Sequence, residues 1–120
     1  MAEAAEYELR DDRARGLLEA YDGDGTVTGR IQYFVLDRDG APAALVAVHT
    51  VVDRGYEGRG IAGALVREFY AIAGRAGLAV VPLCPYAARW AGRHPDEAPE
   101  APAGLVEAAE EELRARPDRW

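Results

Sequence analysis

Gly58-Arg59-Gly60-Ile61-Ala62-Gly63 is the stretch of this sequence that decides the fold. It stands between a segment rich in strand-forming residues, 43–52, and a segment with helical periodicity, 61–76. The N–H groups at the start of a helix have no partner within the helix, and the helix dipole favours negative charge there. Because glycine also lets a phosphate come close to the backbone, this stretch predicts a binding site for a phosphate-bearing ligand.

Upstream of the glycines the sequence predicts strands. Residues 6–10 alternate apolar with charged side chains, and a second short strand is expected over 16–21. Residues 31–36 and 43–52 are rich in β-branched and aromatic residues, and Asp37-Arg38-Asp39-Gly40 between them is typical of a hairpin turn. These patterns predict a mostly antiparallel set of strands before the glycine-rich turn.

The segment 43–52 is apolar on both faces of a regular strand. Simple alternation places Leu45, Ala47, His49 and Val51 on one face, and Val46, Val48, Thr50 and Val52 on the other. Strands that are apolar on both faces are buried on both sides. We therefore expect a central strand here.

Downstream, a helix is predicted from Ile61 to about Ala76, followed by a short strand over 78–84. Pro82 lacks a ladder donor, which indicates an edge, a bulge or a splayed end of that strand. Pro85 is suited to start a short helix over 86–92.

The remaining sequence predicts an acidic, proline-rich linker over 96–102. Residues 103–120 form a C-terminal amphipathic helix and tail, which is expected to pack on the domain or on a partner. Residues 1–95 are left as the main domain.

Charge is unevenly distributed along the chain. The net charge is −7, with 13 acids and 11 arginines in residues 1–95 but 8 acids and 3 arginines in residues 96–120. This balance argues against a nucleic-acid partner and suits a cationic acceptor such as an amine, although a solvated acidic face that maintains solubility is the simpler reading.

The cysteine content and the N-terminal residues indicate the cellular compartment of the protein. Cys84 is the single cysteine, so the chain has no internal disulfide framework and no cysteine metal cluster. The first residues carry no signal-peptide pattern, and no apolar stretch is long enough to cross a bilayer. We expect a cytoplasmic protein without a membrane partner.

Three other ligand motifs fit poorly. Gly58, Gly60 and Gly63 match the letters of the dinucleotide fingerprint, but five residues separate them from the strand and the next strand ends in Cys84 rather than an acid. A P-loop would need lysine and a hydroxyl residue after Gly60. Asp22-Gly23-Asp24-Gly25 lacks the later carboxylates of a calcium loop, so no metal is expected.

Four segments complete the pattern: His49-Thr50-Val51-Val52, Tyr56-Glu57-Gly58-Arg59-Gly60-Ile61-Ala62, Val81-Pro82-Leu83-Cys84-Pro85-Tyr86 and Arg93-His94-Pro95. The order of predicted elements resembles the GNAT acetyltransferase superfamily. The four segments more narrowly resemble the small, single-domain YjdJ-like GNAT family. The resemblance covers about residues 6–95 and implies a compact α+β fold. It has a mostly antiparallel mixed sheet, a splay between two central strands, one main helix after the glycine-rich turn and an additional C-terminal helix.

The resemblance also implies a cofactor, acetyl-CoA or coenzyme A. Its pyrophosphate would lie on the backbone of Gly58, Arg59, Gly60, Ile61 and Ala62. Its pantetheine arm would run between two strand ends. The residues expected to contact this arm and the adenosine end are Val51, Val52, Cys84, Pro85, Arg93 and His94.

Three side chains are candidates for the chemistry of acetyl transfer. His49 can act as a base or position the acceptor, because histidine titrates near neutrality. Cys84 can donate a proton to the CoA thiolate or accept the acetyl group itself, and Tyr86 is a second candidate acid. Each also has a structural interpretation: a hydrogen-bonded strand histidine, a buried packing cysteine and a ring packed at a helix start.

The sequence leaves three functions open. The first is an N-acetyltransferase acting on an unidentified small-molecule or peptide amine, by direct transfer or through Cys84. The second is a CoA-binding regulatory module without catalysis. The third is an interaction protein whose last helix docks in a homodimer.

Overall fold

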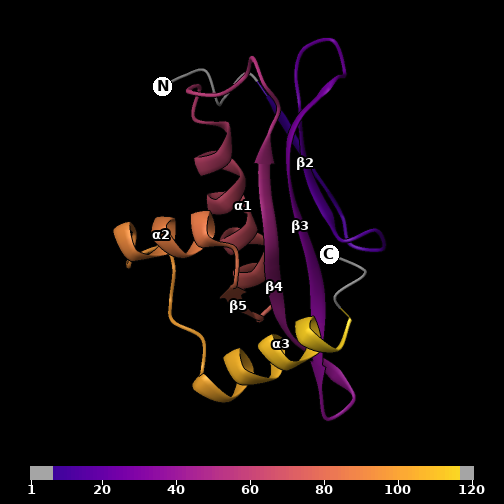
Figure 1. Cartoon of the computed structure of the whole chain (residues 1–120), viewed down its shortest axis with the longest axis vertical. Coiled ribbons are helices and arrows are strands. Elements are labelled where there is room, and N and C mark those ends of the chain that lie inside the picture. The colour runs from indigo at the N-terminus through magenta and orange to yellow at the C-terminus, as the bar shows by residue number, and fades with distance from the viewer. Residues whose placement is uncertain (1–6, 117–120) are drawn as a thin grey trace.

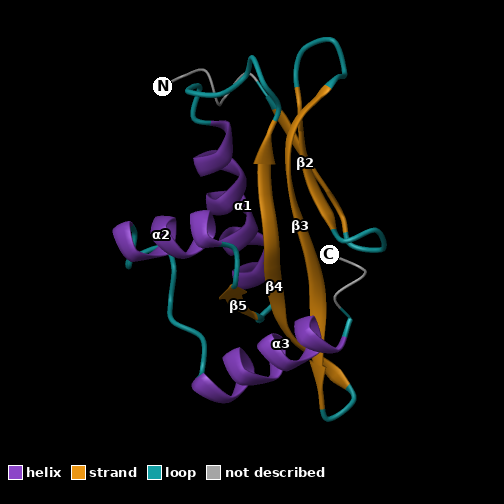
Figure 2. Cartoon of the chain, in the orientation of Figure 1, coloured by secondary structure: helices purple, strands orange, loops and turns teal. Residues whose placement is uncertain are grey.

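The computed structural model describes residues 7–116. These residues form five strands and three helices, arranged as a sheet with helices packed on it (Figures 1 and 2). In chain order they are β1 (Glu8–Asp12), β2 (Leu17–Tyr21), β3 (Val27–Arg38), β4 (Ala41–Val52), α1 (Ile61–Arg75), β5 (Ala79–Pro82), α2 (Pro85–Arg93) and α3 (Ala103–Ala115).

The strands form one mixed sheet in the order β1-β2-β3-β4-β5. The first four strands pair antiparallel, and β5 pairs parallel to β4. The turn between β3 and β4 has Asp39 and Gly40 at φ 56° and 82°, as a tight two-residue hairpin requires. The mixed sheet, the main helix after the glycines and the additional C-terminal helix confirm the predicted α+β fold.

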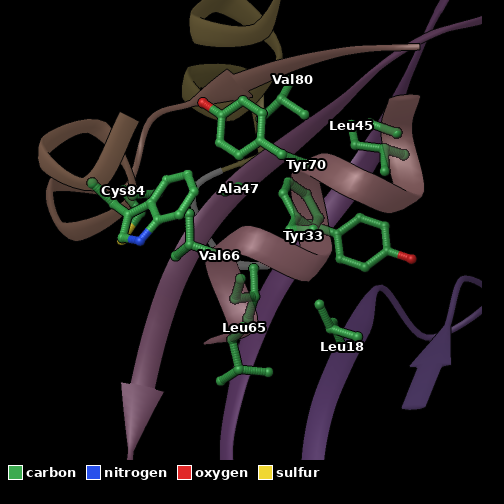
Figure 3. Close-up of a cluster of buried hydrophobic side chains, with 14 of the residues drawn as sticks. Leu18, Tyr33, Leu45, Ala47, Leu65, Val66, Tyr70, Val80 and Cys84 are labelled. Atoms are coloured by element: carbon green, nitrogen blue, oxygen red, sulfur yellow. The ribbon is translucent and has the colours of Figure 1, made fainter. Parts of the chain in front are cut away.

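Helices cover both faces of β4, so the prediction of a central strand buried on both sides is confirmed. Leu45 and Ala47 lie in the larger apolar cluster with the buried stripe of α1, including Leu65 and Phe69 (Figure 3). On the opposite face, the side chains of Ala44, Val46 and Leu36 pack with Leu105 and Ala109 of α3. Figure 1 shows α3 crossing the sheet near the β3–β4 turn, whereas the glycine-rich turn lies at the other end of β4.

A bulge in β4 changes the side-chain alternation. Gln32 pairs with His49, but the next residue of β3, Tyr33, pairs with Ala47, so Val48 is an extra residue in β4. An extra residue reverses the faces of all residues that follow it. The expectation that His49 and Val51 share a face with Ala47 is therefore wrong.

The strands β3 and β4 are longer than their hydrophobic segments. β3 begins at Val27 rather than Ile31, because Thr28 is fully buried and its hydroxyl donates to the carbonyl oxygen of Ala20 at 3.3 Å. The early part of β3 thus pairs with β2 although it contains glycine and arginine. Polar residues there are held by hydrogen bonds that the hydrophobic pattern does not reveal.

Candidate functional site

β4 and β5 separate at one end of their shared ladder. Their pairing ends at Ala47 and Pro82, after which the N–H groups of Leu83 and Cys84 both donate to the carbonyl oxygen of Ala47, at 3.1 and 3.0 Å. The chain then enters α2 at Pro85, while β4 continues to Val52. Of the edge, bulge or splayed end that Pro82 indicates, the structure shows an edge strand with a splayed end. Within residues 7–116, one edge of β4 is left without a neighbouring strand beyond this point.

The backbone of β4 presents polar groups at this edge. The N–H of Asp53 donates to the carbonyl oxygen of Thr28 at 2.8 Å, and hydrogen-bonded pairs alternate with non-bonded pairs along an antiparallel ladder. Val51 and His49 are consequently the residues whose N–H and C=O groups face β3. The N–H and C=O groups of Thr50 and Val52 point the other way, towards the edge that β5 has left.

A cavity of about 500 Å³ lies beside this edge and under the glycine-rich turn. It is lined by Thr50, Val52, Tyr56, Glu57, Gly58, Gly60, Ile61, Ala62, Gly63 and Tyr86. The structure therefore brings one end of β4, the turn, the start of α1 and the start of α2 around one space. Four of the residues predicted to cradle a pyrophosphate, namely Gly58, Gly60, Ile61 and Ala62, line it.

The turn holds its glycines in the left-handed region. Gly58 and Gly60 have φ 81° and 80°, and within residues 7–116 a Cβ added to either would meet no atom within 4 Å other than those of its chain neighbours. Gly60 caps α1, because its carbonyl oxygen accepts the first helical hydrogen bond from Ala64 at 3.0 Å. The first N–H groups of a buried helix thus open onto a space that no side chain of the turn fills, which is the geometry of an anion site.

Cys84 and Thr50 meet in the splay. Cys84 is 5% exposed, and its Sγ lies 3.3 Å from Oγ1 of Thr50. Thr50 reaches this side of the sheet because of the bulge at Val48, and sequence reasoning did not select it. The only signal for it was its place beside His49 in the segment that carried the resemblance.

Tyr86 also lies at the cavity. A Cβ added to Gly63 would stand 3.6 Å from the hydroxyl of Tyr86 and 3.6 Å from Nε1 of Trp90. These are ordinary van der Waals distances, so α1 and α2 pack closely at Gly63. That packing holds the Tyr86 hydroxyl at the cavity wall.

Other predicted site residues lie elsewhere. His49 and Val51 are on the face of β4 opposite Thr50, and Val51 is 41% exposed. Arg59 turns back towards the N-terminal strand, with its Nη1 3.3 Å from the hydroxyl of Tyr7 and its guanidinium 5.2 Å from the centre of the Tyr56 ring. Pro85 forms the first turn of α2.

Arg93 and His94 stand at the opposite end of α2 from Tyr86. The imidazole of His94 stacks on Trp90 at 4.0 Å, and its Nδ1 lies 2.8 Å from the carbonyl oxygen of Trp90. Neither residue lines the cavity under the turn. The contacts of His94 complete the C-terminal end of the helix.

The loop before the glycines is tied to the β2–β3 turn. The hydroxyl of Tyr56 donates to Oδ2 of Asp22 at 2.9 Å, and the N–H of Thr26 donates to Oδ1 of the same carboxylate at 3.0 Å. The backbone donor of Thr26, together with the Tyr56 hydroxyl, holds the pKa of Asp22 below its usual value. The carboxylate of Asp22 thus connects two loops that are distant in the sequence.

This connection makes the stability of the fold sensitive to acid. The pKa of Asp22 is lower in the folded state than in the unfolded state. The Asp22 carboxylate therefore contributes fully to the free energy of unfolding above the unfolded-state pKa of about 4, and this contribution is lost as the pH falls through the folded-state pKa. We expect the urea midpoint of the native chain to fall more steeply between about pH 5 and pH 2 than that of Asp22→Asn. Parallel profiles of the two proteins would show that Asp22 does not tie the loops.

The fold and the site together define the class of protein. A sheet whose fourth and fifth strands diverge, with a glycine-rich helix start beside the divergence, is the architecture of the GNAT superfamily. The chain belongs to the GCN5-related N-acetyl-transferase family, whose family model matches residues 6–100.

Solved structures share parts of this fold. A ribosomal-protein-alanine N-acetyltransferase from Brucella melitensis biovar Abortus 2308 is 23% identical, with a TM-score of 0.52, over 72% of this chain and 62% of that one. A Trypanosoma brucei acetyltransferase is 17% identical, with a TM-score of 0.51, over 75% of this chain and 66% of that one. At these identities the likeness concerns the fold.

A GNAT family N-acetyltransferase from Escherichia coli, solved in complex with CoA, is 32% identical over 56% of this chain and 38% of that one, with a TM-score of 0.49. The chain thus spans between 38% and 66% of the lengths of these three proteins. The comparison with curated proteins gave no match. Among residues 7–116, no helix is long and apolar enough to cross a membrane.

Proposed function

We propose that this protein binds acetyl-CoA between β4 and α2 and transfers its acetyl group to an amine. One observation carries the proposal: the glycine-rich start of α1 and the free backbone edge of β4 line the same cavity. The first suits the pyrophosphate of CoA, and the second suits the amides of the pantetheine arm. Membership of the GCN5-related N-acetyl-transferase family supports this pairing of site and ligand.

The residues beside the splay provide the chemistry. Acetyl-CoA supplies an activated thioester, and its reaction with an amine needs alignment, polarisation of the carbonyl group and a proton for the departing thiolate. The backbone N–H groups of Thr50 and Val52 point into the region where that carbonyl would lie. Two side chains are candidate proton donors: Tyr86, which lines the cavity, and Cys84, whose thiol lies 3.3 Å from Oγ1 of the lining residue Thr50.

Transfer through an acetylated Cys84 remains part of the proposal as a second route. Cys84 is 5% exposed and its Sγ contacts Thr50, so only a ligand inserted in the splay would reach it.

His49 lies on the opposite face of β4, so its proposed role as a base requires the amine to approach from that face. The contacts proposed for Arg93 and His94 with the adenosine end require the cofactor to extend along α2.

The wider assignments from the sequence also stay proposals. They are the narrower YjdJ-like family, an amine acceptor that is a small molecule or a peptide, a cytoplasmic location and the division into 1–95, 96–102 and 103–120. The predicted homodimer and the expected lack of nucleic-acid and membrane partners are proposals as well.

The alternative function is a CoA-binding regulatory module without catalysis. It predicts CoA binding without turnover.

Turnover with substitutions at the splay tests the residue roles. Release of free CoA from acetyl-CoA would be followed across a panel of primary amines. If Tyr86 donates the proton, Tyr86→Phe should lower kcat by about 10²-fold with little change in KM for acetyl-CoA. Cys84→Ala should have a similar effect only if the thiol donates that proton or accepts the acetyl group.

Tyr21→Phe is the matched control, because the Tyr21 hydroxyl contacts Glu19 on β2, outside the cavity, at 2.9 Å. It should keep the native kcat. If both Tyr86→Phe and Cys84→Ala also retain the native rate, neither residue has the proposed role. If CoA binds but no amine in the panel is acetylated, the regulatory alternative is favoured.

A further inference from the structure

A second and larger cavity lies beside the outer edge of β5. It has a volume of about 920 Å³, within the range of small-molecule sites. Its walls come from α1, β5, α2, the segment 95–101 and α3. It shares no lining residue with the cavity under the glycine-rich turn. The proposed acetyl transfer therefore leaves this second space unused.

The cavity contains a buried hydroxyl group that has no hydrogen-bond partner among residues 7–116. Tyr70 of α1 is 7% exposed, and its ring stacks on Trp90 at 5.9 Å. Its hydroxyl makes no hydrogen bond with any residue in the range 7–116. Figure 3 shows the Tyr70 ring beside Val80, with the hydroxyl on the far side of the ring and directed away from the labelled core residues Leu65 and Leu18.

Burial determines the state of this group. It raises the pKa of Tyr70 to about 12, so the phenol keeps its proton at neutral pH. A neutral phenol can both donate and accept a hydrogen bond. Since buried polar groups nearly always have a partner, the Tyr70 hydroxyl is a ready contact for a polar group on a bound molecule.

The rest of the lining defines that molecule. The walls are alanine, proline, glycine and valine, and the charged lining residues are Glu100 and Glu107. Both carboxylates are exposed at the rim of the cavity, and within the described part of the chain neither forms a salt bridge with an arginine. Apolar walls with unpaired carboxylates suit an apolar body that carries a positive charge, and they disfavour an anion.

We infer that this cavity binds an amphipathic amine, with its apolar body against α2 and α3 and its ammonium group at Glu100 and Glu107. The Tyr70 hydroxyl completes the polar contacts. The site is separate from the proposed acetyl-CoA site and does not depend on it. It is formed only when the segment 95–101 and α3 fold back over the edge of β5.

The binding of n-octylamine tests this inference, with octanoate and octan-1-ol as probes of matched length. Trp90, which stacks on Tyr70, reports binding through its fluorescence in a Trp120→Phe background. We expect saturable binding of the amine, at least tenfold tighter than that of octanoate. Saturating CoA should leave this titration unchanged, so failure of the proposed transferase function would not affect the result.

Substitutions in the lining locate the ligand. Tyr70→Phe should weaken amine binding roughly three- to tenfold, as expected for loss of one hydrogen bond. Glu100→Gln with Glu107→Gln should remove the preference for the amine over the alcohol. Glu110→Gln, on the same helix but outside the lining, should change nothing.

Ala88→Phe fills the cavity from an exposed position on α2 and should abolish binding without unfolding the protein, which circular dichroism would check. Equal affinities for octylamine and octanoate would overturn the inference. So would full amine binding by a folded Ala88→Phe protein, by Tyr70→Phe or by the double glutamine variant.

Discussion

Gly60→Ala is expected to weaken the binding of CoA on the order of a hundredfold in isothermal titration calorimetry. Gly60 has φ 80°, where a residue with a Cβ costs about 1–2 kcal/mol. The added methyl group would also project into the space proposed for the pyrophosphate, since no protein atom lies within 4 Å of it. The strain lowers the stability of the fold, whereas occupation of the cradle lowers the affinity for CoA, at about 1.4 kcal/mol for each factor of ten.

Gly25→Ala is the matched control for this substitution. Gly25 lies in the β2–β3 turn with φ 83°, and its added Cβ would also meet open space. The two variants should therefore lose similar stability, about 1–2 kcal/mol each, while only Gly60→Ala loses CoA affinity. Native affinity in Gly60→Ala would mean that the turn does not hold the pyrophosphate.

Gly16→Ala is expected to cause the largest loss of stability, about 3 kcal/mol in urea denaturation. Gly16 has φ 67°, and a Cβ there would stand 2.2 Å from the carbonyl oxygen of Tyr33. The clash is with backbone, and the N–H of Tyr33 donates to the Gly16 carbonyl oxygen at 2.8 Å, so the contact cannot open without breaking a β2–β3 link. The estimate adds about 1–2 kcal/mol for the left-handed conformation to about 1–3 kcal/mol for overpacking.

Comparison with Gly25→Ala separates the cost of the left-handed conformation from the cost of overpacking. Both positions carry the same type of conformational cost, but only Gly16 meets protein atoms. Gly16→Ala should therefore exceed Gly25→Ala by at least about 1 kcal/mol. Equal losses in the two variants would show that β2 and β3 separate easily at this point, contrary to the packing described above.

Much of the fold could be predicted because its signals are local. The helix α1 follows from the spacing of Ile61, Leu65 and Phe69, and its start follows from the glycines before it. The hairpin between β3 and β4 follows from Asp39-Gly40, and Pro82 indicates an edge, a bulge or a splayed end where the structure shows a splayed edge strand. In each case the backbone property of the residue itself determines the structure.

The candidate site was harder to predict because it depends on register. The bulge at Val48 brings Thr50 to the splay and takes His49 and Val51 to the other face. Nothing in the alternation of apolar residues marks the bulge, since both faces of β4 are apolar. To predict which face a side chain takes beyond the bulge, one must know which residue of the neighbouring strand β3 it pairs with.

The cavity beside β5 could not be predicted at all. It forms where α3 and the segment 95–101 pass an edge strand, and it contains Tyr70, which the helical pattern assigns to the core. The helical spacing carries no information on whether the Tyr70 hydroxyl finds a partner, because that depends on contacts among four distant segments.

A crystal structure of the protein with CoA tests the central claim most directly. The account predicts the pyrophosphate on the backbone N–H groups between Gly58 and Ala62, with the pantetheine arm along Thr50 and Val52 and the sulfur atom near Cys84 and Tyr86. A pyrophosphate bound away from the glycine-rich turn, or an arm that does not enter the space between β4 and α2, would contradict it.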